Sequence, residues 1–137
     1  MDKKIKVLAI PPDFTGVGYF RCIAPHKRLY ELYGDEIDVI IKHDIDYNNM
    51  EYLKQFDIIW FNRPLFKNMD LFLEKVKLLQ KEHGVKFVYD IDDYWDVGKG
   101  HPGYGQQARM GFDKFIKKSL PIMDVVTTTT ELFANEL

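Results

Sequence analysis

The segment Asp90-Ile-Asp-Asp-Tyr-Trp-Asp96 holds four carboxylates within seven residues. Like charges this close repel one another, which favours a site that holds a cation, a basic partner or sugar hydroxyls. A hard divalent cation prefers such oxygen ligands, and Tyr94 and Trp95 could stack on the apolar face of a sugar ring. The alternative is an acidic turn in which Asp90 caps backbone groups and the other carboxylates are solvated.

A second candidate segment is the glycine-containing stretch Pro11-Pro-Asp-Phe-Thr-Gly-Val-Gly18. Gly16 and Gly18 would let backbone N–H groups approach an anion where a helix begins. Their spacing matches neither the dinucleotide-binding pattern nor the P-loop pattern, so a tight turn is an equal alternative. Arg21 could clamp a phosphate or carboxylate of a ligand, or it could pair with a loop aspartate.

Further polar side chains follow other expected strands. Asn62 and Arg63 could contact hydroxyls or phosphates, with a plain turn as the alternative. His101, in a glycine-rich loop, could act as a general base near neutral pH or could be an inert exposed histidine. The threonines at 127–130 supply hydroxyl donors and an N-cap for a following helix, or a simple strand edge. The remaining histidines are expected at the surface: His26, His43 and His83.

Short apolar runs and helical segments alternate along the chain that must position these groups. The pattern predicts one α/β domain over residues 1–137, a doubly wound parallel sheet of about five strands with helices on both faces. We expect the strand order 3-2-1-4-5, with ligands bound beyond the carboxyl ends of the strands. The expected strands are 5–10, 37–41, 58–61, 85–89 and 123–126, and the expected helices end near 34, 56, 83, 120 and 137.

Composition narrows the function classes. The chain has 137 residues, 46% of them hydrophobic and 29% charged, with a net charge of −2. This balance excludes a disordered chain, and it implies no general affinity for nucleic acids. The single cysteine, Cys22, cannot form an intramolecular disulfide and is expected to be a buried apolar residue. No apolar run has the ~18 residues of a transmembrane helix, so we expect a cytoplasmic protein.

Taken in order, these segments resemble the N-terminal domain of retaining GT-B glycosyltransferases, the family that includes glycogen and sucrose synthases. Gly16-Val-Gly-Tyr-Phe-Arg21, followed by Pro25 and Leu29, resembles that family's first loop and helix. Tyr89-Asp-Ile-Asp-Asp-Tyr-Trp95 with His101-Pro102 is similar to a segment of a phage and bacterial subgroup. Residues 127–131 resemble the turn that ends the family's first sheet region.

The resemblance implies an acceptor-side half of an enzyme that moves a sugar from a nucleotide sugar to a glycan or another acceptor. The donor-binding C-terminal domain is expected to be absent from these residues, so the isolated chain should be inactive. The resemblance implies no metal and no cofactor, because the nucleotide sugar is a substrate. The implied donor-binding residues are Gly16, Val17, Gly18 and Arg21. The implied acceptor-binding residues are Asn62, Arg63, Asp90, Asp92, Tyr94 and Trp95, and the implied catalytic residues are Asp93 and His101.

The competing interpretation is a non-catalytic flavodoxin-like module that regulates or binds a partner. A receiver domain, one version of it, would need paired acids after the first strand, an aspartate after the third and a lysine after the fifth. Here Asn62 and Arg63 follow the third expected strand, and threonines follow the fifth. If the chain is half of an enzyme, its exposed cleft face could also let it self-associate.

Overall fold

A five-stranded, all-parallel sheet forms the centre of the computed structural model, which describes residues 3–62, 68–92, 99–102, 105 and 112–137. The α/β class is therefore confirmed. Asp90 lies inside the fourth strand rather than in the loop after it. The strands are β1 (Ile5–Ile10), β2 (Ile37–Ile41), β3 (Ile58–Phe61), β4 (Lys86–Ile91) and β5 (Val125–Thr128).

The strand order is β2-β1-β3-β4-β5, so the expected order 3-2-1-4-5 is wrong. Burial explains the difference. The last four residues of β1 and the last three of β3 are buried, whereas exposure alternates along β2, which carries Asp38. An apolar strand such as β3 gains most from a central position, because there both of its faces are covered. β2, along which exposed and partly buried positions alternate, accordingly takes the edge.

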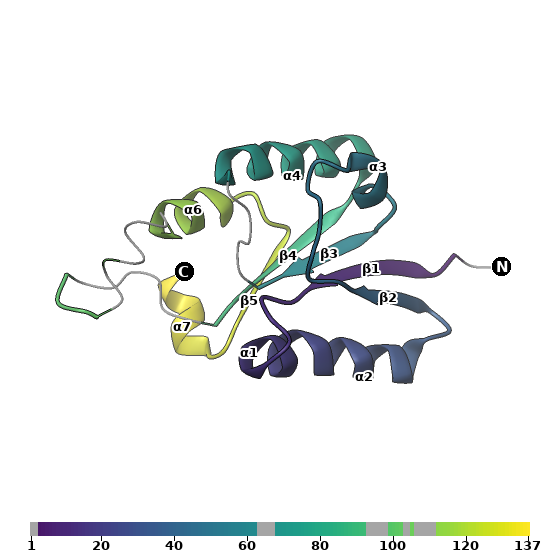
Figure 1. Cartoon of the computed structure of the whole chain (residues 1–137), viewed down its shortest axis with the longest axis horizontal. Coiled ribbons are helices and arrows are strands. Elements are labelled where there is room, and N and C mark those ends of the chain that lie inside the picture. Colours follow the sequence, from purple (N-terminus) through teal and green to yellow (C-terminus); the bar gives the residue numbers. More distant parts are fainter. Residues whose placement is uncertain (1–2, 63–67, 93–98, 103–104, 106–111) are drawn as a thin grey trace.

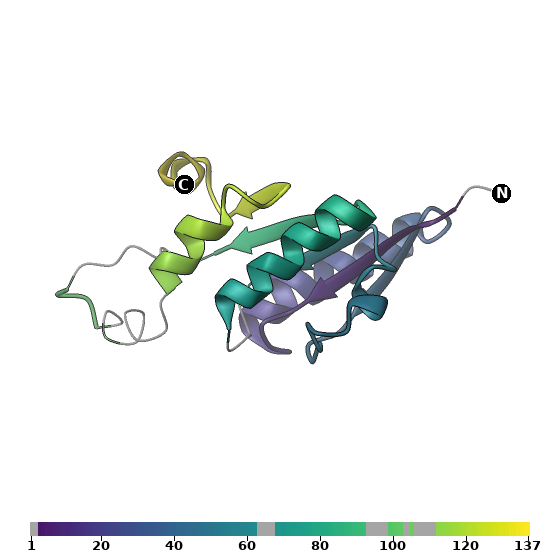
Figure 2. The same cartoon turned by 90° about the horizontal axis from the view of Figure 1, so that it is seen from above.

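Helices cover both faces of the sheet, as the sequence predicts (Figure 1). On one face lie α3, α4 and α6, and on the other lies a continuous helical segment of α1, a π-helical turn and α2. Figure 2 shows α4 in front of the strands and α2 behind them. The bounds are α1 (Gly16–Gly18), the π-helical turn η1 (Tyr19–Ile23), α2 (Ala24–Tyr33), α3 (Met50–Leu53), α4 (Met69–His83), α6 (Phe112–Ser119) and α7 (Glu131–Glu136).

The two faces of the sheet carry cores of unequal size. The core on the α4 side is large and aromatic, and Phe61 stacks on Tyr89 within it with ring centroids 4.6 Å apart. The core on the α2 side is built from only three buried hydrophobic residues, Ala9, Cys22 and Trp60. Within the part of the chain that the structure describes, no helix has the length and apolar character needed to span a membrane.

Gly84 ends α4 in the left-handed conformation, with φ at +66°, and its N–H donates to the Leu79 carbonyl. A Cβ at this position would meet nothing within 4 Å, so substitution carries only the conformational cost. We expect Gly84→Ala to lower the free energy of unfolding by about 1 kcal/mol and Gly84→Asn by less, because asparagine tolerates this conformation. Urea unfolding measures both variants, and equal stability of the alanine variant and the native chain would contradict this account.

Candidate functional site

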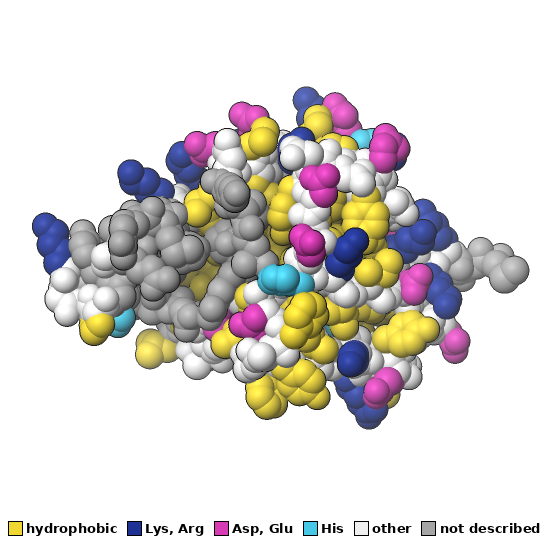
Figure 3. All heavy atoms as spheres, viewed as in Figure 1, with side chains coloured by type: hydrophobic (Ala, Val, Ile, Leu, Met, Phe, Trp, Pro, Cys, Tyr) yellow, Lys and Arg dark blue, Asp and Glu magenta, His cyan; other side chains and the backbone are white. Residues whose placement is uncertain are grey.

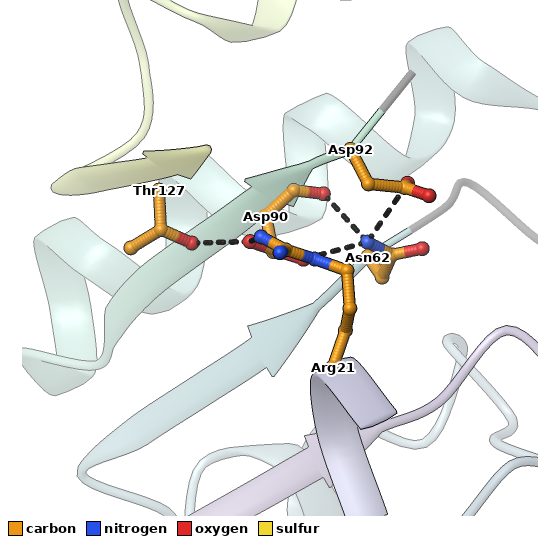
Figure 4. A network of polar contacts seen from close by, with 5 residues as sticks. All are labelled: Arg21, Asn62, Asp90, Asp92 and Thr127. Carbon is orange, nitrogen blue, oxygen red and sulfur yellow. Dashed lines mark hydrogen bonds and ion pairs between the residues drawn. The ribbon is translucent and has the colours of Figure 1, made fainter. Parts of the chain in front are cut away.

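The buried carboxylate of Asp90 is the centre of a polar network at the carboxyl edge of the sheet (Figure 4). The Asp90 side chain is only 3% exposed. One of its oxygens, Oδ2, accepts from Nε of Arg21 at 2.7 Å and from Nδ2 of Asn62 at 2.7 Å. The other, Oδ1, accepts from Nη2 of Arg21 at 2.5 Å and from Oγ1 of Thr127 at 2.7 Å. Both carboxylate oxygens are thus fully engaged.

Four segments that are distant in sequence supply the members of this network. Arg21 belongs to the π-helical turn that follows β1, and Asn62 directly follows β3. Asp90 and Thr127 are partners in the β4–β5 register, so their side chains share one face of the sheet. β1 and β3 are neighbours whose following helices lie on opposite faces. The network therefore surrounds the switch point at which open α/β sheets bind their ligands.

The Arg21–Asp90 contact is a bidentate ion pair, the geometry that a guanidinium makes best. Its hydrogen bond to Asp90 raises the pKa of Arg21 above its usual value, partial burial opposes this rise, and the charges of Asp90 and Asp92 add to it. The Arg21 side chain is 27% exposed and that of Asp90 3% exposed, so the pair joins a partly exposed cation to a buried carboxylate. Of the two alternatives for Arg21, the structure shows pairing with an aspartate of the chain. That aspartate, Asp90, lies in strand β4 and not in a loop.

Asn62 links two carboxylates of the acidic segment, those of Asp90 and Asp92. Its side chain is almost fully buried, and Nδ2 donates to the Asp90 carbonyl at 3.1 Å and to Oδ1 of Asp92 at 3.2 Å. Asp90, in the last part of β4, and Asp92, just after it, lie at the same edge of the parallel sheet as Gly16 and Gly18, which follow β1. Asp92 is partly exposed above this network.

The glycine-containing loop is closed by Asp13, a residue that the sequence reasoning overlooked. Oδ1 of Asp13 accepts from the backbone N–H of Thr15 at 3.0 Å and of Gly18 at 3.2 Å. The N–H group expected to reach the donor's phosphates thus already has an anionic partner within the chain. Aspartate side chains commonly accept from the backbone N–H two residues on in turns, a local signal that could have revealed this. The donor-binding roles of Gly16 and Val17 stay predictions, with Gly16 exposed and Val17 partly buried.

His101 is not among the residues of the network drawn in Figure 4. His101 is exposed, and its catalytic role stays a prediction. Arg63, Asp93, Tyr94 and Trp95 lie outside the described residues. Among the residues that are described, no group of three or more His, Cys, Asp or Glu side chains could hold a metal ion.

His26 lies beneath the network, and the expectation that it is a surface residue is wrong. It is only 9% exposed, its Nδ1–H donates to the Cys22 carbonyl at 2.8 Å, and its ring meets Trp60 edge-on. Burial lowers the pKa of His26. Burial also raises the pKa of the Cys22 thiol to about 12, so this cysteine is not a nucleophile at neutral pH.

Exposed aromatic side chains gather on the loop and helical segment after β1, and hydrophobic side chains are visible on the face drawn in Figure 3. Phe14 and Phe20 are 62% and 74% exposed, and Tyr19 packs edge-on against Phe20. Exposed apolar groups of this kind are what the expected self-association would need. Self-association itself stays a prediction.

Compared with protein-family models, curated proteins and solved structures, the chain matches none of them.

Gly18 and Gly16 form a matched pair for testing the role of the Asp13 loop. A Cβ on Gly18 would lie 1.9 Å from the Asp13 carbonyl oxygen, whereas a Cβ on Gly16 meets nothing within 4 Å. We expect Gly18→Ala to lower the free energy of unfolding by about 1–3 kcal/mol, the usual range for overpacking. Gly16→Ala should leave it unchanged or raise it slightly. Chemical denaturation of both variants measures this, and equal effects would refute the close approach.

His26 makes stability depend on pH near neutrality. Its folded pKa lies below the unfolded value near 6.5, so the unfolded chain takes up the proton first as the pH falls. The contribution of the neutral ring is complete above about pH 6.5 and is lost as the pH falls from there toward the folded pKa. Urea unfolding at pH 7.5 and pH 5.5 should show a larger loss for the native chain than for His26→Gln. An equal loss in the two proteins would assign the pH dependence to other groups.

Proposed function

We propose that the chain is the N-terminal, acceptor-side domain of a glycosyltransferase of the GT-B type. The observation that carries the proposal is the network of Arg21, Asn62, Asp90 and Thr127 at the carboxyl edge of a parallel sheet, around its switch point. Ligands of open α/β sheets bind at this position. The carboxylate and amide groups there suit a ligand rich in hydroxyl groups.

Sugar transfer depends strongly on how donor and acceptor are held, and a fixed polar surface contributes to this. Both oxygens of Asp90 are engaged within the chain, so we assign Asp90 a positioning role: it holds Arg21 and Asn62. Asp92 and Asn62 would then face the acceptor, and His101 would serve as the base. The groups that hold the nucleotide diphosphate would belong to a second domain outside these 137 residues.

The strand order is compatible with a second candidate, a non-catalytic module, because β2-β1-β3-β4-β5 is the order of flavodoxin-like folds. The same order also remains when the third strand is removed from the Rossmann order 3-2-1-4-5-6, so topology does not separate the two. Chemistry at the edge weighs against a receiver-type module. The single acid after β1, Asp13, closes its own loop, and Asn62 stands where a receiver needs an aspartate.

Turnover by the complete product of the encoding gene tests the proposal, with a panel of nucleotide sugars and simple glycosides as substrates. Arg21→Lys should lower turnover by about tenfold or more, because lysine cannot donate two parallel bonds to Asp90 and small misplacements of this kind are costly. Arg28→Lys is the matched control, since Arg28 pairs with Glu31 on an exposed helix surface and should tolerate the change. The 137-residue chain alone should transfer no sugar.

His101→Ala in the same complete protein should lower turnover more than it lowers the thermal midpoint, because an exposed side chain contributes little to the core. Absence of transfer from every nucleotide sugar in the panel would favour the non-catalytic module. Rapid transfer by the isolated chain would refute the assignment of a half-enzyme.

A further inference from the structure

The amide oxygen of Asn62 is a buried acceptor without a hydrogen-bond donor. Asn62 is only 2% exposed, and its Oδ1 has no partner among the described residues. Buried polar atoms are almost always paired, because an unpaired one loses its bonds to water and gains nothing in return. An unpaired acceptor at the carboxyl edge of the sheet therefore points to a donor that the described residues do not supply.

The surroundings of Asn62 fix which way its amide faces. Three oxygen atoms surround Nδ2: the Asp90 carbonyl, Oδ2 of Asp90 and Oδ1 of Asp92. Turning the amide over would place Oδ1 against these three acceptors and leave the NH₂ group outside. Figure 4 shows the oxygen directed away from Asp90, on the side of Asp92.

We propose that Oδ1 of Asn62 accepts a hydrogen bond from a hydroxyl group of a bound sugar ring that lies beside Asp92. This inference rests on the proposed function and names the position of its acceptor sugar. A sugar ring carries adjacent hydroxyl donors, and carboxylate and amide oxygens accept from them.

The charges around Asn62 favour a neutral, donor-rich ligand over an anion. Arg21 is already paired with Asp90, so its charge is not available to a phosphate at this point. A phosphate would bring further negative charge to this point. The nearby loop also has no free cradle at Gly18, because its N–H donates to Asp13.

A divalent cation fits the same residues poorly. Each oxygen of Asp90 already accepts two hydrogen bonds, so neither has a lone pair to offer. Oδ1 of Asp92 faces the Asn62 NH₂ group, a donor that a cation would have to displace. Ca²⁺ needs six to eight oxygen ligands, far more than Asn62 and Asp92 supply.

Nuclear magnetic resonance of the ¹⁵N-labelled chain tests the proposal directly, because the Asn62 NH₂ group gives its own pair of signals. Methyl glycosides of glucose, mannose, galactose and N-acetylglucosamine are titrated separately at millimolar concentrations, alongside inorganic phosphate, MgCl₂ and CaCl₂. We expect at least one glycoside to shift the Asn62 side-chain signals and the Asp92 backbone amide, and the salts to leave them in place.

Gln80 offers a matched internal control at the opposite edge of the sheet. Its Nε2 donates to a backbone carbonyl, that of Ile122, and to an aspartate, Asp124, as Nδ2 of Asn62 does. Its side-chain signals should not move. Asn62→Ala should weaken binding of that glycoside by about tenfold, equivalent to about 1.4 kcal/mol, while Gln80→Ala should bind like the native chain.

The outcomes separate this inference from the proposed function. Shifts at Asn62 produced only by phosphate or by a divalent cation would overturn the sugar site, and so would an unmoved Asn62 signal in every glycoside titration. The wild-type titration decides this even if Asn62→Ala does not fold. If the complete protein transfers sugar and Asn62→Ala does not change the rate, the sugar site at Asn62 is refuted and the transferase function is retained. Glycoside binding at Asn62 without transfer from any nucleotide sugar would keep the site and refute the transferase.

Discussion

The burial of one carboxylate, that of Asp90, is the constraint on which the carboxyl edge depends. A charged group in this position is stable only when its partners are in place, and removing one partner of such a pair typically costs about 3–5 kcal/mol. Those partners come from the turn after β1, from the end of β3 and from β5. These segments therefore stabilise one another, because displacing any of them would leave the buried carboxylate of Asp90 short of a hydrogen-bond donor.

This constraint also explains why the two faces of the sheet differ. The α4 side is held by a large aromatic core, whereas the α2 side has few apolar groups. There the hydrogen bonds of Arg21, and the contact of His26 with Trp60, join the helical segment to the sheet. Hydrogen bonds are directional and hydrophobic contacts are not, so the polar side fixes positions more sharply. A binding surface needs that property.

Local patterns were sufficient to predict the strands, the helices on both faces and the shared edge of the acidic block. Strand order was not predictable in the same way, because it depends on which strand gains more from burial, and this comparison between strands is not contained in any local pattern. The burial of His26 was within reach, since it follows Cys22 by four residues and shares its helix face. The pairing of Arg21 with Asp90 spans 69 residues, a separation about which residue spacing carries no information.

The π-helical turn at Tyr19–Ile23 makes the position of Arg21 sensitive to the length of the chain in this segment. A π-helical turn closes its hydrogen bonds one residue later than an α-helical turn, and one residue rotates a helix by about 100°. A single-codon deletion there would restore ordinary helix geometry and turn the segment before it relative to α2. The reach of Arg21 toward β4 can therefore arise or vanish in one insertion or deletion, with no side chain exchanged.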